Sequence, residues 1–179
     1  MANKKPCIPD LIRARLREAP ESRLTWAEVM RRALYEPGLG YYRRDVHRIG
    51  RGGDFFTSVS VGPLFGRLLA VFAHRLWTAM DRPAGFTIME QGAHDGTLAR
   101  DVLEGCRAMS PEFFETVEYG IIEPDEVLRA AQRTTVGDAL APKLWQRESG
   151  IPSRPALFLC NELLDAFPVH RVRWTGDAW

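Results

Sequence analysis

A glycine turn flanked by acidic residues lies near the middle of the chain. Residues 90–96 read Glu-Gln-Gly-Ala-His-Asp-Gly and follow a short β-type run, Phe86 to Glu90. Gly92 lets the chain turn sharply, and Gly96 lets the next helix begin close to the strand or to a ligand. Glu123 ends the next predicted strand, where a carboxylate can accept both hydroxyls of an adenosine ribose. The cofactor-lining residues predicted in this part of the chain are Glu90, Gly92, His94, Gly96 and Glu123.

The residues between the two glycines indicate which cofactor fits. A dinucleotide site uses GxGxxG and leaves the helix N-terminus free for a pyrophosphate. Here His94 replaces the central glycine, and the carboxylate of Asp95 at the helix start would repel a diphosphate. S-adenosylmethionine has no phosphate and carries a cationic sulfonium and an amino group, so Glu90 and Asp95 favour it. The alternative is that Asp95 only caps the helix and that the glycines only turn the chain.

A second polar group follows the apolar run Ala156 to Cys160. Asn161 and Glu162 emerge at the end of this predicted strand, on the edge of a parallel sheet where ligands bind. Glu162 and Asp165 would be neighbours on one helical turn, and two carboxylates can hold a guanidinium and accept its proton. We therefore predict that Asn161, Glu162 and Asp165 are catalytic. The alternative is that Glu162 and Asp165 cap a helix and face water.

The elements that position these residues predict an α/β fold. After residue 85, apolar strands alternate with helices, which implies βαβ units and a Rossmann-like, doubly wound parallel sheet covered on both faces. The predicted strands are Phe86–Glu90, Val117–Glu123, residues 143–146 and Ala156–Cys160, and the predicted helices between them are Thr97–Met109 and residues 126–133.

The first part of the chain is predicted to be helical. Thr25 to Glu28 forms a capping box that begins a helix, and another helix runs from about Gly62 to Met80. Residues 36–60 between them form a long loop rich in glycine, arginine and aromatic residues. We expect an N-terminal helical region over residues 1–80, with residues 36–60 as a cofactor lid, and a partial Rossmann-like domain over residues 81–179.

Composition excludes several classes of protein. The chain has 179 residues, 45% hydrophobic and 26% charged, and its net charge of +1 argues against a nucleic-acid binder. Charged residues interrupt the apolar segment Val61 to Met80, which argues against a membrane helix. The N-terminus lacks the features of a signal or transit peptide, so a cytoplasmic location is expected. Three separated cysteines predict reduced thiols, with Cys106 and Cys160 buried.

The predicted sheet stops after about four strands. His170 to Trp174 alternates like a further strand, and Thr175 to Asp177 resembles a hairpin turn. A sheet that stops here would leave an apolar edge, which proteins normally cover. We expect that the chain is the first part of a longer enzyme whose remainder covers this edge, or that a second copy covers it in a homodimer.

Several blocks of residues occur in order between about Trp26 and Val169. The blocks are Gly40-Tyr-Tyr42, Gly53-Asp-Phe55 with Thr57-Ser58, Phe65-Gly66, Glu90-x-Gly92-x-x-x-Gly96, Glu123-Pro124, Gln132, and Asn161-Glu-x-x-Asp165-Ala-x-Pro168. Together they resemble the MidA-like methyltransferases, a family related to the mitochondrial assembly factor for respiratory complex I. The resemblance implies a class I S-adenosylmethionine-dependent methyltransferase, and mitochondrial members of the family are linked to protein arginine methylation.

The resemblance also implies roles for particular residues. Asn161 and Glu162 would face the methyl group, and His94 departs from the glycine that is usual in the family. The residues implied to line the cofactor are Glu90, Gly92, Gly96 and Glu123. The residues implied to close over it are Gly53, Asp54 and Thr57.

Three functions remain open at this stage. The leading interpretation is an enzyme that methylates a protein side-chain nitrogen, with arginine as the candidate, and that acts on a protein substrate without contacting membrane or nucleic acid. The second is a non-catalytic assembly or binding module that retains the methyltransferase fold. The third is an NAD-dependent oxidoreductase, which His94 and Asp95 disfavour.

Overall fold

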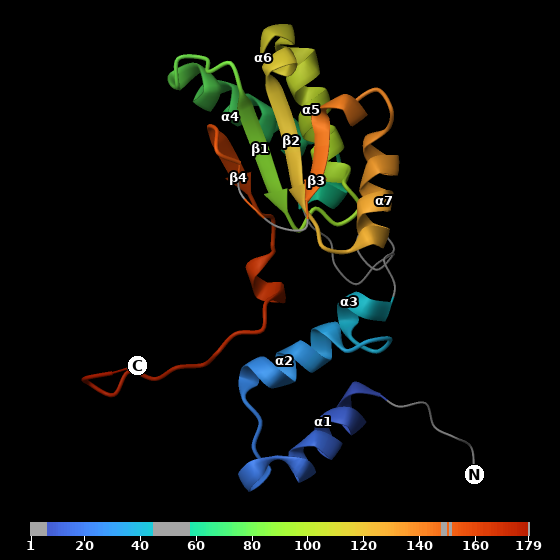
Figure 1. Cartoon of the computed structure of the whole chain (residues 1–179), viewed down its shortest axis with the longest axis vertical. Helices are drawn as coiled ribbons and strands as arrows, with labels where there is room; N and C mark the ends of the chain where they lie inside the picture. The colour runs from blue at the N-terminus through green and yellow to red at the C-terminus, as the bar shows by residue number, and fades with distance from the viewer. Residues whose placement is uncertain (1–6, 45–57, 148–149, 151, 179) are drawn as a thin grey trace. The chain divides into compact units, whose positions relative to one another are not determined.

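The computed structural model describes residues 7–44, 58–147, 150 and 152–178. The chain divides into two compact units (Figure 1): the first takes in Met1–Arg48 and Leu164–Trp179, and the second takes in Ile49–Leu163. This division differs from the predicted boundary between residues 80 and 81, because α4 (Leu64–Ala79) packs against α5 (Thr97–Met109) in the second unit.

The first unit is built from short helices. They are α1 (Ile8–Glu18), α2 (Trp26–Tyr35), α3 (Tyr41–Arg44) and 3-10 turns at Pro20–Ser22 and Leu164–Ala166. The Thr25 side chain accepts a hydrogen bond from the Glu28 amide at 3.2 Å, as the predicted helix start requires. The Tyr35 hydroxyl donates to the Ala166 carbonyl at 2.7 Å and so ties α2 to the C-terminal part of this unit.

The second unit contains a four-stranded parallel sheet in the order β3-β2-β1-β4. The strands are β1 (Phe86–Gln91), β2 (Val117–Ile122), β3 (Leu144–Arg147) and β4 (Ala156–Leu159). Besides α4 and α5, the helices are α6 (Pro111–Thr116) and α7 (Glu126–Val136). The predicted α/β fold and parallel sheet are confirmed. Helix α6 was not predicted. Ser110 ends α5, and its side chain caps α6 by accepting a hydrogen bond from the Phe113 amide.

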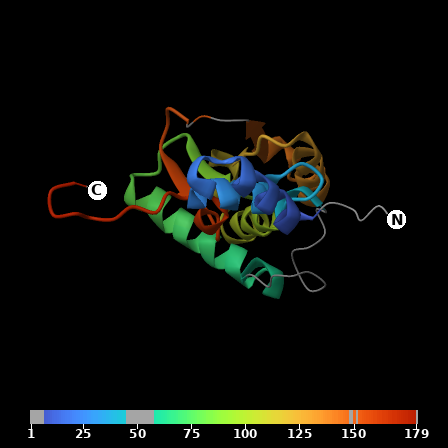
Figure 2. The same cartoon turned by 90° about the horizontal axis from the view of Figure 1, so that it is seen from below.

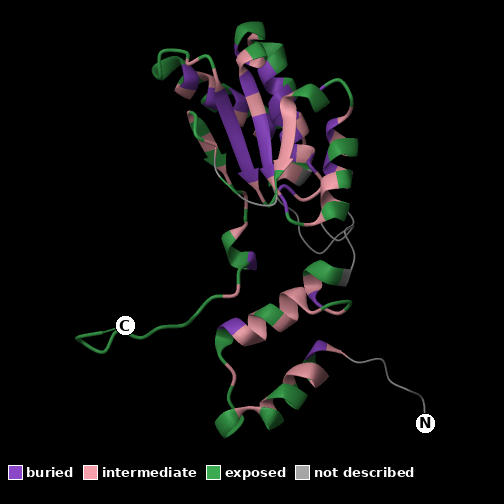
Figure 3. Ribbon diagram, viewed as in Figure 1, coloured by how far each residue is buried: buried purple, intermediate pink, exposed green. Residues whose placement is uncertain are grey.

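The core of the second unit lies on one face of the sheet. Side chains alternate between the two faces along each strand, and Ile88 of β1 and Tyr119 of β2 lie on this face, where they pack with helix residues such as Val102. Figures 1 and 2 place α4 and α5 together on that side, and Figure 3 shows the buried strands β1 and β2 beside them. The sequence predicted cover on both faces, but the described helices of this unit lie on one.

The strand β4 forms one edge of the sheet, because only β1 pairs with it among the described strands. Phe158 is 46% exposed as a result. Cys106 is buried as predicted, but Cys160 is exposed, since it follows an edge strand rather than a strand covered on both sides. Apolar sequence alone did not distinguish these two environments.

The predicted strand at residues 170–174 is absent. These residues form neither helix nor strand and are exposed, because alternation creates a strand only where a neighbouring strand supplies hydrogen bonds. The turn after them is present in a simple form: the Thr175 amide donates to the Ala178 carbonyl at 2.9 Å. Across the described parts of the chain, every helix is too short or too polar to span a membrane.

Candidate functional site

The turn between β1 and α5 depends on its two glycines. Gly92 and Gly96 have φ angles of 82° and 85°, a region that glycine adopts without steric cost. A Cβ atom at Gly96 would lie 2.9 Å from the Cα atom of Gln132, so α7 approaches the turn too closely for any side chain there. His94, at φ 47°, is in the left-handed region as well, although it has a side chain.

Asp95 stands directly before Gly96, the N-cap residue of α5, and its side chain binds the first amide of that helix. Its Oδ1 accepts a hydrogen bond from the Thr97 amide at 3.0 Å and lies 3.7 Å from His94 Nδ1. Burial opposes ionisation, but the hydrogen bonds to His94 and Thr97 outweigh it and lower the pKa of Asp95 to about 2. The side chain is 46% exposed. Asp95 therefore presents a negative charge at the start of α5 while it accepts the hydrogen bond from the Thr97 amide.

Glu90 lies beneath the turn, on the face of the sheet that the helices cover. Its residue is 2% exposed, and its carboxyl group accepts a hydrogen bond from the Tyr119 hydroxyl at 2.8 Å. Burial raises the pKa of Glu90 to about 7; the Tyr119 hydrogen bond partly offsets that rise, and the charge of Asp95 adds to it. The carboxyl group that was predicted to line the cofactor is thus held by a core tyrosine.

Glu123 follows β2 at the same edge as the glycine turn. The register pairs Gln91 with Ile122, so the residues after both strands emerge side by side. Oε1 of Glu123 accepts from the Asp125 amide at 2.9 Å, while Oε2 lies 3.5 Å from the side-chain nitrogen of Gln132. That separation is long for a hydrogen bond, so Oε2 keeps acceptor capacity. Burial is the main cause that raises the pKa of Glu123.

Gln132 is a residue at this edge to which the sequence analysis gave no role. It is fully buried on α7, and its side-chain nitrogen donates to the His94 carbonyl at 3.0 Å. The detectable signal was a polar residue four positions before Val136 on the apolar stripe of an amphipathic helix. Because buried polar groups need partners, such a position predicts a specific hydrogen bond.

The segment after β4 reaches the same turn. A Cβ atom at Gly92 would lie 2.9 Å from Leu163 Cδ1, so Leu163 packs over the turn, and Asn161 and Glu162 immediately precede it. Glu162 has a φ of 51° and lies outside the 3-10 turn that contains Asp165. The predicted helical pairing of these two carboxylates is therefore wrong, because the backbone at Glu162 is left-handed.

Asp165 belongs to the first unit, whereas Asn161 and Glu162 belong to the second. Burial raises the pKa of Tyr42, and the negative charge of Asp165 raises it further. The tyrosines whose pKa the Asp165 charge raises, Tyr35 and Tyr42, belong to the first unit as well. Gly53, Asp54 and Thr57, which were predicted to close over the cofactor, lie outside the described residues.

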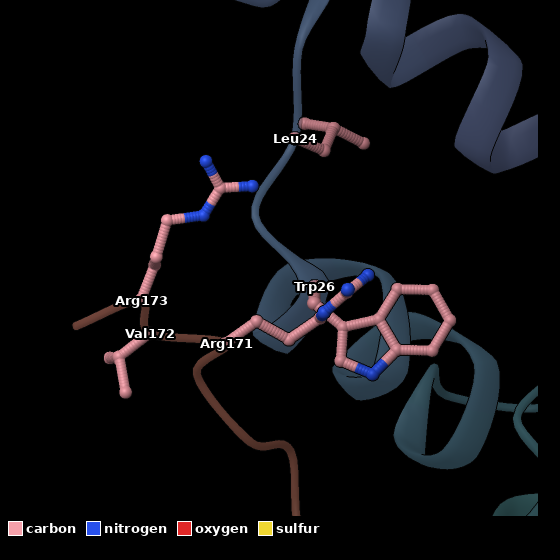
Figure 4. Close-up of a pocket in the computed structure, with 5 residues that line it drawn as sticks. All are labelled: Leu24, Trp26, Arg171, Val172 and Arg173. Atoms are coloured by element: carbon pink, nitrogen blue, oxygen red, sulfur yellow. The ribbon is translucent and has the colours of Figure 1, made fainter. Parts of the chain in front are cut away.

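An open cavity of about 410 Å³ lies in the first unit (Figure 4). Its lining residues are Leu24, Trp26, Arg171, Val172 and Arg173. None of the predicted site residues lines it, so the candidate site rests on the strand ends of the second unit.

The fold and the turn define a class of protein. A parallel α/β sheet with a glycine turn after its central strand and a carboxylate after the next strand is the frame of a Rossmann-like cofactor domain. A family model described as "Putative S-adenosyl-L-methionine-dependent methyltransferase" matches residues 68–179, more than half of the chain. The chain belongs to this methyltransferase family, which confirms the family resemblance of the sequence.

Named relatives agree with this assignment. The chain is 33% identical over 177 residues to the mitochondrial protein arginine methyltransferase NDUFAF7 homolog of Drosophila melanogaster, covering 86% of this chain and 39% of the relative. It is 27% identical over 179 residues to the human mitochondrial protein arginine methyltransferase NDUFAF7, covering 87% of this chain and 40% of the relative. The chain thus spans about two fifths of the length of these relatives.

A solved structure has the same fold. It is a protein from Burkholderia thailandensis, assigned as a methyltransferase by inference and crystallised with S-adenosylhomocysteine bound. The TM-score is 0.74 and the sequence identity 31%, and the match covers 90% of this chain and 42% of the other. The similarity therefore extends over both the sheet and most of the remaining chain.

One expectation is overturned by the comparisons. The predicted cytoplasmic location is contradicted, because the Drosophila and human relatives are named as mitochondrial proteins. That prediction rested on the composition of the first residues alone, and the relatives outweigh it.

Proposed function

We propose that this chain forms the cofactor-binding part of an S-adenosylmethionine-dependent methyltransferase that acts on a protein nitrogen, with arginine as the side chain. The observation that carries the proposal is the charged glycine turn: Asp95 places a carboxylate at the start of α5, and Glu123 follows the neighbouring strand. The names of the relatives, which are protein arginine methyltransferases, support the choice of substrate.

The charges of the turn fit this cofactor better than a dinucleotide. The low pKa of Asp95, about 2, keeps its half-exposed side chain negative at neutral pH. A negative charge at a helix N-terminus attracts the ammonium group of S-adenosylmethionine and repels the pyrophosphate of NAD. The S-adenosylhomocysteine bound by the Burkholderia protein supports the same choice.

The second carboxylate oxygen of Glu123 is proposed to bind the ribose. Oε1 is occupied by the Asp125 amide, while Oε2 has only the distant Gln132 nitrogen and can accept from a ribose hydroxyl. The Gly53, Asp54 and Thr57 segment is proposed to close over the cofactor. His94 and Gly96 are proposed to line the cofactor through the backbone of the turn.

The residues after β4 are proposed to orient the substrate. S-adenosylmethionine, when bound, supplies an electrophilic methyl group on its sulfonium. Asn161 and Glu162 precede Leu163, which packs over Gly92. We propose that their acceptor oxygens align the substrate nitrogen and take its proton.

The partner proposal follows from the exposed edge. Phe158 on β4 is 46% exposed, and an apolar edge strand pairs readily with further polypeptide. The cover is either additional chain of the same enzyme or a second copy. Light scattering of the protein tests this proposal, because a chain with an uncovered apolar edge should associate. A stable monomer that shows no tendency to associate would contradict the proposal.

Calorimetric titration tests the proposed cofactor. The protein should bind S-adenosylmethionine and S-adenosylhomocysteine but not NAD, and Glu123→Ala should weaken both by about tenfold, the effect of a lost charge-assisted hydrogen bond. Glu115→Ala is the matched control, because this carboxylate is 81% exposed on α6. Binding of NAD alone would favour a dehydrogenase, and binding of none of the three ligands would favour a non-catalytic module.

A further inference from the structure

The side-chain amide of Gln132 joins three elements at the edge of the sheet. Its nitrogen donates to the His94 carbonyl in the glycine turn at 3.0 Å. Its oxygen accepts from the Gln146 side chain on β3 at 2.8 Å, and the same Gln146 nitrogen also donates to the Arg129 carbonyl at 3.0 Å. Because Gln132 is fully buried, water cannot replace these partners.

The bond to His94 supports a backbone conformation that needs support. His94 has a φ of 47°, which is disfavoured for a residue with a Cβ atom and persists only where its surroundings fix it. Within the turn, the Gly96 amide donates to the Ala93 carbonyl at 2.8 Å. The His94 carbonyl instead receives its hydrogen bond from outside the turn, from Gln132.

The geometry favours an effect on the turn over an effect on Glu123. The nitrogen of Gln132 lies 3.0 Å from the His94 carbonyl oxygen but 3.5 Å from Glu123 Oε2. A difference of this size separates a good hydrogen bond from a marginal one. The Cα atom of Gln132 would lie 2.9 Å from a Cβ atom at Gly96, so α7 is packed directly against the turn and the amide has little freedom to move away.

The carbonyl that Gln132 holds belongs to the peptide group that links His94 to Asp95. The next residue, Asp95, carries the negative charge that suits the ammonium group of the cofactor's amino-acid part, so a shift of the His94 peptide would displace that charge. Glu123, which suits the ribose, is held separately by the Asp125 amide.

We infer that Gln132 is a positioning residue that fixes the His94 peptide and, through it, the Asp95 carboxylate that recognises the amino-acid part of the cofactor. This inference rests on the proposed function. It predicts that Gln132 contributes to the binding of the amino-acid part and contributes little to the binding of the adenosine part.

Two ligands separate this role from a general structural role. S-adenosylhomocysteine carries the amino-acid part, and 5′-methylthioadenosine carries only the adenosine part with a methylated sulfur. Gln132→Glu keeps an acceptor for Gln146 and removes the donor to His94 when ionised. Gln132→Met removes both bonds without adding a charge and serves as the second variant should Gln132→Glu prevent folding. Thermal unfolding without ligand establishes that each variant is folded.

The inference predicts a selective loss in calorimetric titrations. The dissociation constant for S-adenosylhomocysteine should rise about tenfold in a folded Gln132 variant, as expected for one lost hydrogen bond, while that for 5′-methylthioadenosine changes less than about twofold. The control Gln146→Leu leaves the bond to His94 in place, so the ratio of the two dissociation constants should match that of the wild type.

Four results would overturn the inference. Equal weakening of both ligands would indicate a structural role for Gln132, and unchanged affinity for both would show that the turn holds itself. A changed ratio in Gln146→Leu would place the effect elsewhere in the network. Wild-type protein that binds neither ligand would overturn the proposed function, and the inference with it, and this outcome is distinct because it appears before any substitution is made.

Discussion

Substitution of Gly96 by alanine tests the close approach of α7 to the turn. Gly96 has a φ of 85°, and its new Cβ atom would lie 2.9 Å from the Cα atom of Gln132. Gly92→Ala is the matched control, because Gly92 has a φ of 82° and its Cβ atom would also meet an atom at 2.9 Å, but that atom is the mobile end of the Leu163 side chain.

The two variants share one cost and differ in another. The left-handed backbone costs alanine about 1–2 kcal/mol in either position, and the loss of unfolded-state freedom offsets about 0.4–1 kcal/mol of it in both. Crowding of a backbone atom, which cannot rotate away, adds about 1–3 kcal/mol at Gly96. Gly96→Ala should therefore lose at least about 1 kcal/mol more free energy of unfolding than Gly92→Ala.

Urea unfolding followed by tryptophan fluorescence measures this difference. The slope of the transition should stay the same in both variants, so that the midpoints report stability directly. Gly96→Ala that is as stable as Gly92→Ala, with an unchanged slope, would refute the contact between α7 and the turn on which the site geometry depends.

Three further substitutions have defined outcomes. The pKa of Glu90 is raised from 4.5 to about 7, so the folded state binds the proton more tightly and the wild type loses stability as pH rises from about 4.5 to 7. Glu90→Gln should remove about 3 kcal/mol of this pH dependence. An unchanged stability profile in chemical denaturation would contradict the buried carboxyl group. The pKa of Asp95 is lowered from 3.8 to about 2, so its stabilising contribution is present above pH 4 and is lost toward pH 2. Asp95→Asn should lower the melting temperature at pH 7 by more than at pH 3. Equal shifts at the two pH values would contradict a stabilising negative charge on Asp95. Thr25→Ala should cost about 1 kcal/mol by removing the cap of α2, as measured by urea unfolding, and no change would show that the cap is not formed in solution.

Strong local periodicity made much of the fold predictable. The helix predicted over Thr97–Met109 is α5 with the same bounds, because apolar residues recur at helical spacing between a glycine and Ser110-Pro111. The strand predicted over Phe86–Glu90 is β1, which extends one residue further. Segments whose structure depends on distant partners were less predictable, as residues 170–174 show, since alternation by itself supplies no hydrogen-bonded neighbour.

The candidate site was predictable in its backbone and less so in its side chains. Gly92 and Gly96 follow from the turn that any such sheet needs, and their positive φ angles agree. The partner of Glu90, the core residue Tyr119, lies 29 positions away, so no local pattern indicated the buried hydrogen bond. Gln132 stands among the residues that carry the family resemblance, but its role was not predictable for the same reason: its partner His94 lies 38 positions away, and the bond exists only because α7 packs on the turn.

The central claim is that the turn after β1 and the carboxylate after β2 form one cofactor site. Backbone amide resonances, followed by nuclear magnetic resonance during titration with S-adenosylhomocysteine, test it most directly. The account predicts saturable shifts concentrated at residues 92–97 and 123–125, with little change on addition of NAD. Shifts that avoid both segments, or that NAD reproduces, would contradict the account.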